Sequence, residues 1–120
     1  MEKGEKSGNT LIPAAETALF CEQIALMLHS GILLTDGVEA LRDAYKASRY
    51  APRFCALSDR VHETGTLYEA VQESGLFPKY MVQMVRIGER SGSLEEIMTA
   101  LAAYYHGEEQ VRTDLRNAVV

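Results

Sequence analysis

The sequence predicts an all-α protein, folded as a compact antiparallel bundle of about six helices. Apolar residues recur at three- and four-residue spacing in successive segments, and each segment is bounded by helix-capping residues, proline or glycine. Alternating β-branched runs of useful length, which would indicate strands, are almost absent. Because the connections are short, successive helices are expected to lie antiparallel, and 120 residues suffice for one domain with its own core.

The chain divides into a tail and one folded domain. Residues 1–13 are rich in Lys, Glu, Gly and Ser without an apolar period, which predicts a flexible tail, and the domain is expected to span residues 14–120. The first helix is expected from Ala14 to Ser30, with Gly31 as its stop. Its inward stripe is expected to be Leu19, Phe20, Ile24, Met27 and Leu28.

The second helix is expected to begin at a capping box. Thr35 and Asp36 supply N-cap side chains, and Glu39 lies three residues after Asp36. The expected inward residues are Val38, Leu41 and Tyr45.

The third and fourth helices are marked by proline, glycine and a second capping box. Ala51 to Thr64 forms the third, since Pro52 suits a first helical turn and Gly65 follows as a stop. The pair Thr66 and Glu69 fits a capping box, which predicts a short fourth helix ending at Gly75.

The last two helices follow the apolar joint at residues 76–78. Pro78 opens the fifth helix, which is expected to end near Arg90. Ser93 and Glu96 fit another capping box and open a long final helix that has no stop signal. Its expected apolar positions are Leu94, Ile97, Met98, Leu101, Tyr105, Val111, Leu115 and Ala118.

The charge balance argues against nucleic acid as a partner. Twelve Lys and Arg against seventeen Asp and Glu give a formal net charge of -5, the wrong sign for neutralising phosphates. The chain has no run of about 18 apolar residues and no signal-peptide pattern. A soluble, cytoplasmic chain is therefore expected.

No residues are spaced like a metal, cofactor or catalytic site, and a non-enzymatic protein without a cofactor is expected. His29, His62 and His106 are well separated; His29 is expected to cap the first helix, and the other two to be solvated rather than ligands. Cys21 and Cys55 fall within apolar helical patterns, which predicts two small buried side chains.

The most basic stretch lies between the second and third helices. Basic side chains alternate there with Tyr45, Tyr50 and Phe54. Such a stretch suits contact with nucleic acid, an acidic protein or lipid head groups, although a solvated helix face is the favoured interpretation. The candidate interaction residues are Arg42, Lys46 and Arg49, followed by Arg53.

The segment Gly-Glu-Arg-Ser-Gly between the last two helices has two interpretations. Phosphate binding at a helix N-terminus is the weaker one, because no Lys-Ser or Lys-Thr pair follows. A tight turn is favoured: Gly88 and Gly92 allow a close helix approach, and Gly92 can take positive φ. Glu89 is then the expected contact residue, while Gly31 and Gly65 are the other structural turn glycines.

Five motifs follow one another along the chain: the stretch Phe20 to Leu41, the block Gly65 to Val71, Phe77-Pro78, the run Gly88 to Leu94, and Leu101 with Tyr104 or Tyr105. Taken in order, these motifs resemble the type II secretion system F domain family. The resemblance covers about Thr17 to Val120. One departure is Leu33, where the family often has proline after a Gly-Ile pair.

The resemblance implies the first cytoplasmic domain of an inner-membrane platform protein from a type II secretion, type IV pilus or competence machine. Such a domain is a scaffold that contacts the assembly ATPase and other cytoplasmic components, allows pairing with a second copy, and precedes a membrane helix. It would lie on the cytoplasmic face of the bacterial inner membrane. The alternative is an unrelated helical regulatory or nucleic-acid-binding module that uses the stretch from Arg42 to Arg53.

Overall fold

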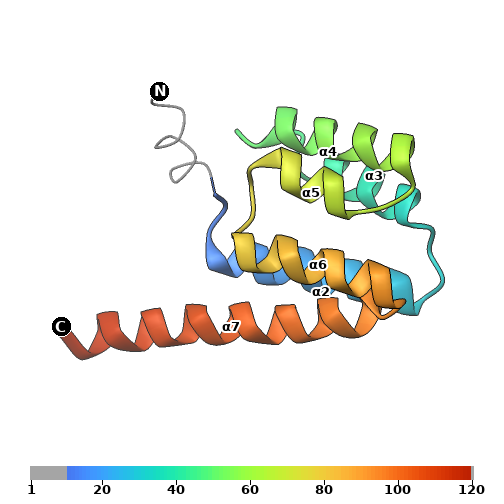
Figure 1. The fold of residues 1–120 in the computed structure, drawn as a ribbon. Helices are drawn as coiled ribbons and strands as arrows, with labels where there is room; N and C mark the ends of the chain where they lie inside the picture. Colours follow the sequence, from blue (N-terminus) through green and yellow to red (C-terminus); the bar gives the residue numbers. More distant parts are fainter. Residues whose placement is uncertain (1–10, 120) are drawn as a thin grey trace, which may run out of the picture.

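Six α-helices make up the fold in the computed structural model, which describes residues 11–119. They run in alternating directions, so consecutive helices are antiparallel (Figure 1). No strand occurs within residues 11–119, and the predicted all-α bundle is confirmed. The helices are α2 (Ala14–His29), α3 (Leu34–Ala44), α4 (Ala51–Thr64), α5 (Tyr68–Ser74), α6 (Lys79–Ser91) and α7 (Leu94–Val119).

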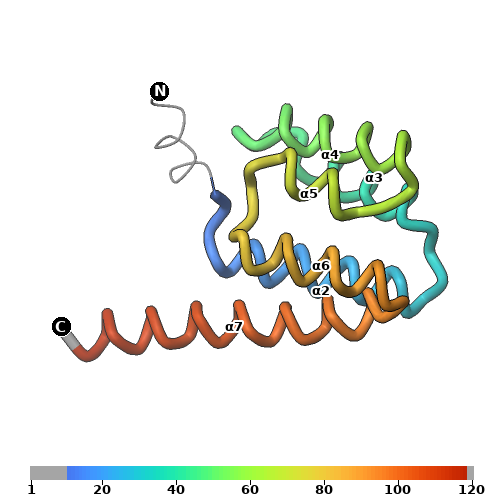
Figure 2. Tube along the Cα trace, in the orientation of Figure 1, coloured from blue at the N-terminus to red at the C-terminus, as the bar shows by residue number. Residues whose placement is uncertain are grey.

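The helices stack in three tiers (Figures 1 and 2). One outer tier holds α3, α4 and α5, the middle tier holds α2 and α6, and α7 lies along the other outer side. Contacts join α2 to α7 and to α3, and α6 to α5 and to α7. Because α2 and α6 have neighbours in both outer tiers, the core lies on both of their sides.

Aromatic rings fill the contact between the tier of α4 and the tier of α2. The Phe20 ring centroid lies 4.5 Å from that of Phe77 and 6.3 Å from that of Phe54. Tyr45 stacks on Phe54 with a centroid separation of 4.0 Å. Rings of this size bury large apolar areas. This cluster therefore holds together α2, α4, the end of α3 and the connection between α5 and α6.

The folded part also includes residues ahead of the first helix. Ile12 is 4% exposed, and its N–H donates to the Leu76 carbonyl at 2.9 Å. This contact fixes the entry of the chain beside the joint between α5 and α6. Residues 1–10 of the predicted tail lie outside the described residues.

The start of α3 differs from the predicted capping box. The helix begins at Leu34, so Thr35 and Asp36 lie inside its first turn rather than ahead of it, and no side chain caps it. Asp36 still places a negative charge near the positive end of the helix. The Glu39 carboxylate reaches away from the backbone and contacts His62 of α4.

Five apolar or thiol positions, Ala118 among them, are exposed although their spacing predicts burial. Cys55 is exposed, whereas Cys21 is fully buried as predicted. Leu19 is 44% exposed, Val111 58% and Leu115 64%. Apolar spacing alone does not reveal whether another element covers a given helix face.

Candidate functional site

The three histidines do not converge; each pairs with a glutamate of a different helix. His29 Nδ1 lies 2.9 Å from Glu95 Oε2, and His106 Nε2 lies 3.5 Å from Glu22 Oε1. Both pairs join α2 to α7. His29 is thus a cross-helix partner rather than only the predicted cap of α2.

The third histidine, His62, joins α4 to α3. Its Nδ1 lies 2.7 Å from the Ser58 carbonyl and its Nε2 lies 2.7 Å from the Glu39 carboxylate. Both neighbours are acceptors, so an imidazolium that donates from both nitrogens satisfies both. The hydrogen bond to Ser58, followed by the Glu39 carboxylate, raises the pKa of His62.

The buried thiol is suited to packing rather than to reaction. Burial raises the pKa of Cys21 to about 12, and its Sγ lies 3.7 Å from Met81 Sδ. A thiol is nucleophilic only as the thiolate, which burial disfavours. Within residues 11–119, no cluster of three or more His, Cys, Asp or Glu side chains could hold a metal ion.

Glu89, the predicted contact residue, caps a neighbouring helix. Its carboxylate accepts hydrogen bonds from the N–H of Leu67 at 2.5 Å and of Tyr68 at 3.0 Å, at the start of α5. Thr66 instead donates its hydroxyl to Glu69, and no side chain of α5 caps its own backbone. The predicted capping box is therefore replaced by a carboxylate from α6, which stabilises the N–H groups and the positive end of the helix.

Gly88 and Gly92 lie where α6 turns into α7. A Cβ on Gly88 would come within 3.2 Å of the Ile97 Cβ and of the Leu94 Cα. Gly92 ends α6 with φ of 73°. Gly31 and Gly65 also have positive φ, at the ends of α2 and α4.

The basic stretch is spread over the α3–α4 corner. Arg42 lies 3.3 Å from the Asp43 carboxylate, and Arg49 lies over the Tyr50 ring, 5.1 Å from its centroid. Lys46 is exposed in the turn between them. Arg53 donates to the Gly75 carbonyl at 3.5 Å. Two of these guanidinium groups thus have partners next to them in the chain, and the four do not form a single cluster.

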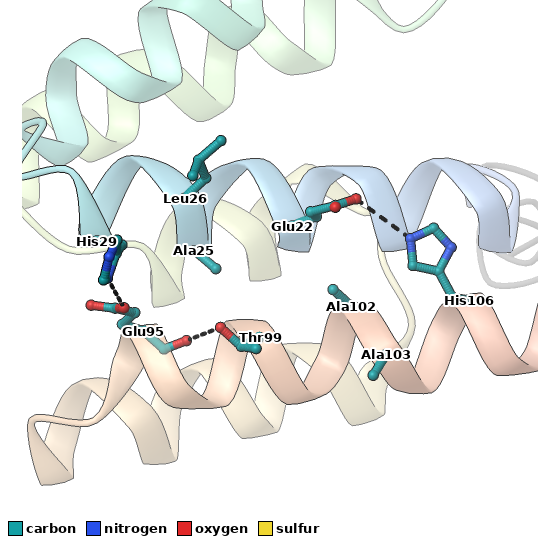
Figure 3. Close-up of a pocket in the computed structure, with 9 residues that line it drawn as sticks. All are labelled: Glu22, Ala25, Leu26, His29, Glu95, Thr99, Ala102, Ala103 and His106. Atoms are coloured by element: carbon teal, nitrogen blue, oxygen red, sulfur yellow. Dashed lines mark hydrogen bonds and ion pairs between the residues drawn. The ribbon is translucent and has the colours of Figure 1, made fainter.

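An apolar groove between α2 and α7 was not predicted from the sequence. It has a volume of about 490 Å³, and its floor includes the buried Ala25 and Ala102. Figure 3 shows the pair of His29 and Glu95 at one end and that of Glu22 and His106 at the other. The signal in the sequence is weak, because alanine occurs in many helix faces.

A second, smaller groove lies on the other side of α2, against α3. Its volume is about 260 Å³, and it is lined in part by Met27, Leu41 and Ala44. Leu26 is 63% exposed and lines both grooves. Leu26 lies outside the predicted inward stripe of α2. A leucine on the outward face of a predicted helix was the one sign in the sequence of the two grooves beside it.

None of the six helices within residues 11–119 is both long enough and apolar enough to span a membrane.

Comparison with known proteins places this fold. Residues 20–120 match the family described as type II secretion system (T2SS), protein F. The chain is 30% identical to type II secretion system protein F of Vibrio cholerae over 86 residues, which are 72% of this chain and 21% of that protein.

Relatives also include pilus proteins. The chain is 27% identical to type IV pilus assembly protein PilC of Thermus thermophilus over 104 residues, 87% of this chain and 26% of that protein. It is 28% identical to the protein transport protein HofC homolog of Escherichia coli over 85 residues, 71% of this chain and 21% of that protein. The chain thus spans about a fifth to a quarter of the length of these relatives. With a family match over most of its residues, the chain belongs to the type II secretion system protein F family.

Proposed function

We propose that this domain is a non-enzymatic docking module of the platform protein of a type II secretion or type IV pilus assembly machine. The observation that carries this proposal is the family match over residues 20–120, with relatives named for both machines. We infer that its partners are the assembly ATPase and other cytoplasmic components, and that it can pair with a second copy.

Support for a non-enzymatic role comes from the pairing of the ionisable side chains. His29, His62 and His106 each contact one glutamate; two of these pairs join α2 to α7 at separate points, and the third joins α4 to α3. Nucleophilic catalysis needs a nucleophile and a base within hydrogen-bonding distance of each other, with a donor placed to stabilise charge on the reacting atom. The pairs instead join helices, as expected of a scaffold.

We infer that the domain lies on the cytoplasmic face of the bacterial inner membrane, as one part of a longer membrane protein. The matched segment makes up only 21 to 32% of the relatives. The resemblance implies a membrane helix that follows the domain.

Binding of the chain to the assembly ATPases of its own organism tests this proposal. The immobilised chain is titrated with the purified secretion or pilus ATPase, with interferometry as the readout. Saturable binding to one ATPase is expected. Absence of binding to every such ATPase, under conditions in which the full-length platform protein binds one, contradicts the proposal.

A pair of matched variants then tests the basic corner as the contact. R42A/K46A/R49A removes three positive charges there, of which Arg42 is half-buried, and K79A/R112A/R116A removes three exposed ones from α6 and α7. If the corner binds the ATPase, only the first variant loses affinity, by roughly tenfold or more. Family membership excludes the alternative of an unrelated module; salt-dependent binding of the chain to nucleic acid would still contradict the docking role.

A further inference from the structure

The outer face of α2 combines an exposed apolar ridge with a groove on either side. Leu26 is the ridge, and its 63% exposure is large for an apolar side chain in a helix with a partner on each side. The small side chains of Ala25 and Ala102 keep the floor of the larger groove low. A surface of this shape accepts the apolar face of an incoming helix, whose side chains fit into the grooves beside the ridge.

The ends of the larger groove carry negative charge. The side chains of Glu22 and Glu95 are 60% and 43% exposed, and within residues 11–119 each carboxylate contacts one ring nitrogen of its histidine. A carboxylate has about four acceptor sites, so each can accept further hydrogen bonds from an incoming cation. Figure 3 shows these carboxylates near opposite ends of the groove, with the alanines between them.

The spacing of the charged pairs gives a dimension for the occupant. The pairs are seven residues apart on α2, from Glu22 to His29, and eleven apart on α7, from Glu95 to His106. At a rise of 1.5 Å per residue these separations are roughly 10 Å and 16 Å. Two basic residues placed two to three turns apart on an incoming helix would therefore reach the carboxylates of Glu22 and Glu95 at the same time.

We propose that the α2 surface, defined by Leu26, Ala25, Ala102, Glu22 and Glu95, binds an amphipathic helix of another protein. The apolar stripe of that helix covers Leu26 and the alanine floor, and Lys or Arg side chains at its two ends pair with Glu22 and Glu95. This inference deepens the docking role proposed above and rests on it. A second copy of the chain fits less well, because a symmetric contact would bring the acidic ends of two grooves together.

A designed peptide provides the test. The probe is an alanine-rich helical peptide of about 18 residues, with a Leu stripe and with Lys at two positions eleven residues apart. The control peptide carries Glu in place of both Lys residues. Fluorescence anisotropy is expected to show saturable binding of the Lys peptide, weaker at high salt, and at least about tenfold weaker binding of the Glu peptide.

Matched variants of the chain locate the binding. E22Q/E95Q is expected to weaken binding of the Lys peptide about tenfold, whereas D59N/E96Q, with the same change of charge at exposed sites, is expected to leave it unchanged. Leu26→Ala is expected to weaken binding of the Lys peptide by a similar factor. Leu115→Ala, at a leucine of nearly the same exposure, is expected to leave that binding unchanged. Circular dichroism checks that all four variants fold.

Four outcomes overturn the inference. The first is equal binding of both peptides, and the second is unchanged affinity in E22Q/E95Q. The third is a dimer in sedimentation that Leu26→Ala dissociates while no peptide binds, which would assign the surface to a second copy. The fourth is binding of the assembly ATPase without binding of the Lys peptide, which rejects this inference and leaves the docking role intact. Binding of the Lys peptide without binding of the ATPase rejects only the ATPase as partner.

Discussion

The two halves of α7 have similar apolar spacing but different surroundings. Residues 94–106 pack against α2 and α6, and Met98, Leu101 and Tyr105 are at most 3% exposed. The C-terminal end of α7 projects past the other helices (Figure 1), and Val111 and Leu115 in the second half of α7 are exposed. An apolar stripe therefore predicts a helix in both halves, but it predicts burial only where another helix lies against it.

Truncation of a leucine in each half should give the largest difference. Leu101→Ala is expected to lower the free energy of unfolding by about 2–5 kcal/mol, because a buried cavity remains. Leu115→Ala is expected to change it by less than about 0.5 kcal/mol. Urea denaturation followed by circular dichroism measures both. Equal losses would mean that the second half is also covered in solution.

Glycine substitutions sharpen the same comparison. Gly88→Val is expected to lower the free energy of unfolding by about 1–3 kcal/mol, because its Cβ would lie within 3.2 Å of Ile97 and Leu94. Gly107→Ala, at a helical position where the added Cβ meets no atom beyond the neighbouring backbone of its own helix within 4 Å, is expected to raise it by about 1 kcal/mol. The opposite signs separate a close helix contact from an open helix face. A stabilising Gly88→Val would contradict the close approach of α6 and α7.

Removal of the Glu89 carboxylate is expected to have a smaller effect. Glu89→Ala leaves the N–H groups of Leu67 and Tyr68 without their acceptor and should lower the free energy of unfolding by about 1–2 kcal/mol. Hydrogen exchange of these two amides should accelerate more than exchange elsewhere in α5. The control is Glu108→Ala on the projecting half of α7. Unchanged exchange at Leu67 and Tyr68 would exclude Glu89 as the cap of α5.

Helix positions were predictable from the sequence because their signals are local. Pro52 and Gly65 bound α4 at the predicted residues. Proline restricts φ to a value that suits the first helical turn, and glycine permits the positive φ that ends the helix. The capping partners were not predictable in this way. Glu89 lies 22 residues after Leu67 in the chain, and only the packing of α6 on α5 brings it to that helix.

The interaction surface was the least predictable feature. Basic residues close together in sequence, from Arg42 to Arg53, suggest a site, but their side chains are distributed around a corner of the fold. The groove between α2 and α7 combines residues about 75 positions apart, such as Ala25 and Ala102. Each is an ordinary helix residue by itself, so the groove exists only once α7 has packed against α2.

The smallest predicted effects are on the pH dependence of stability. They distinguish an ion pair that joins two helices from an ion pair within the second half of α7. His62 contacts Glu39 of α3, whereas Glu109 contacts Arg112 one turn away in α7. The pKa of His62 is raised, first by its hydrogen bond to Ser58. Its stabilising contribution is therefore complete below the ordinary value of 6.5 and is lost as pH rises through the higher folded-state pKa.

The pair in α7 should act at the other end of the pH range. The hydrogen bond from Arg112 lowers the pKa of Glu109, so its contribution is present above the ordinary value of 4.5 and is lost as pH falls through the lower folded-state pKa. In thermal unfolding, His62→Gln should remove part of the loss of stability between about pH 6 and pH 8, and Glu109→Gln should flatten only the acid side. The His62 pair should be coupled more strongly to unfolding of the whole bundle than the α7 pair. The reason is that α3 and α4 separate only when the bundle unfolds, while the α7 pair can break when the end of its helix frays. A profile unchanged by His62→Gln but altered by Glu109→Gln would mean that the projecting half, rather than the α3–α4 contact, couples protons to folding.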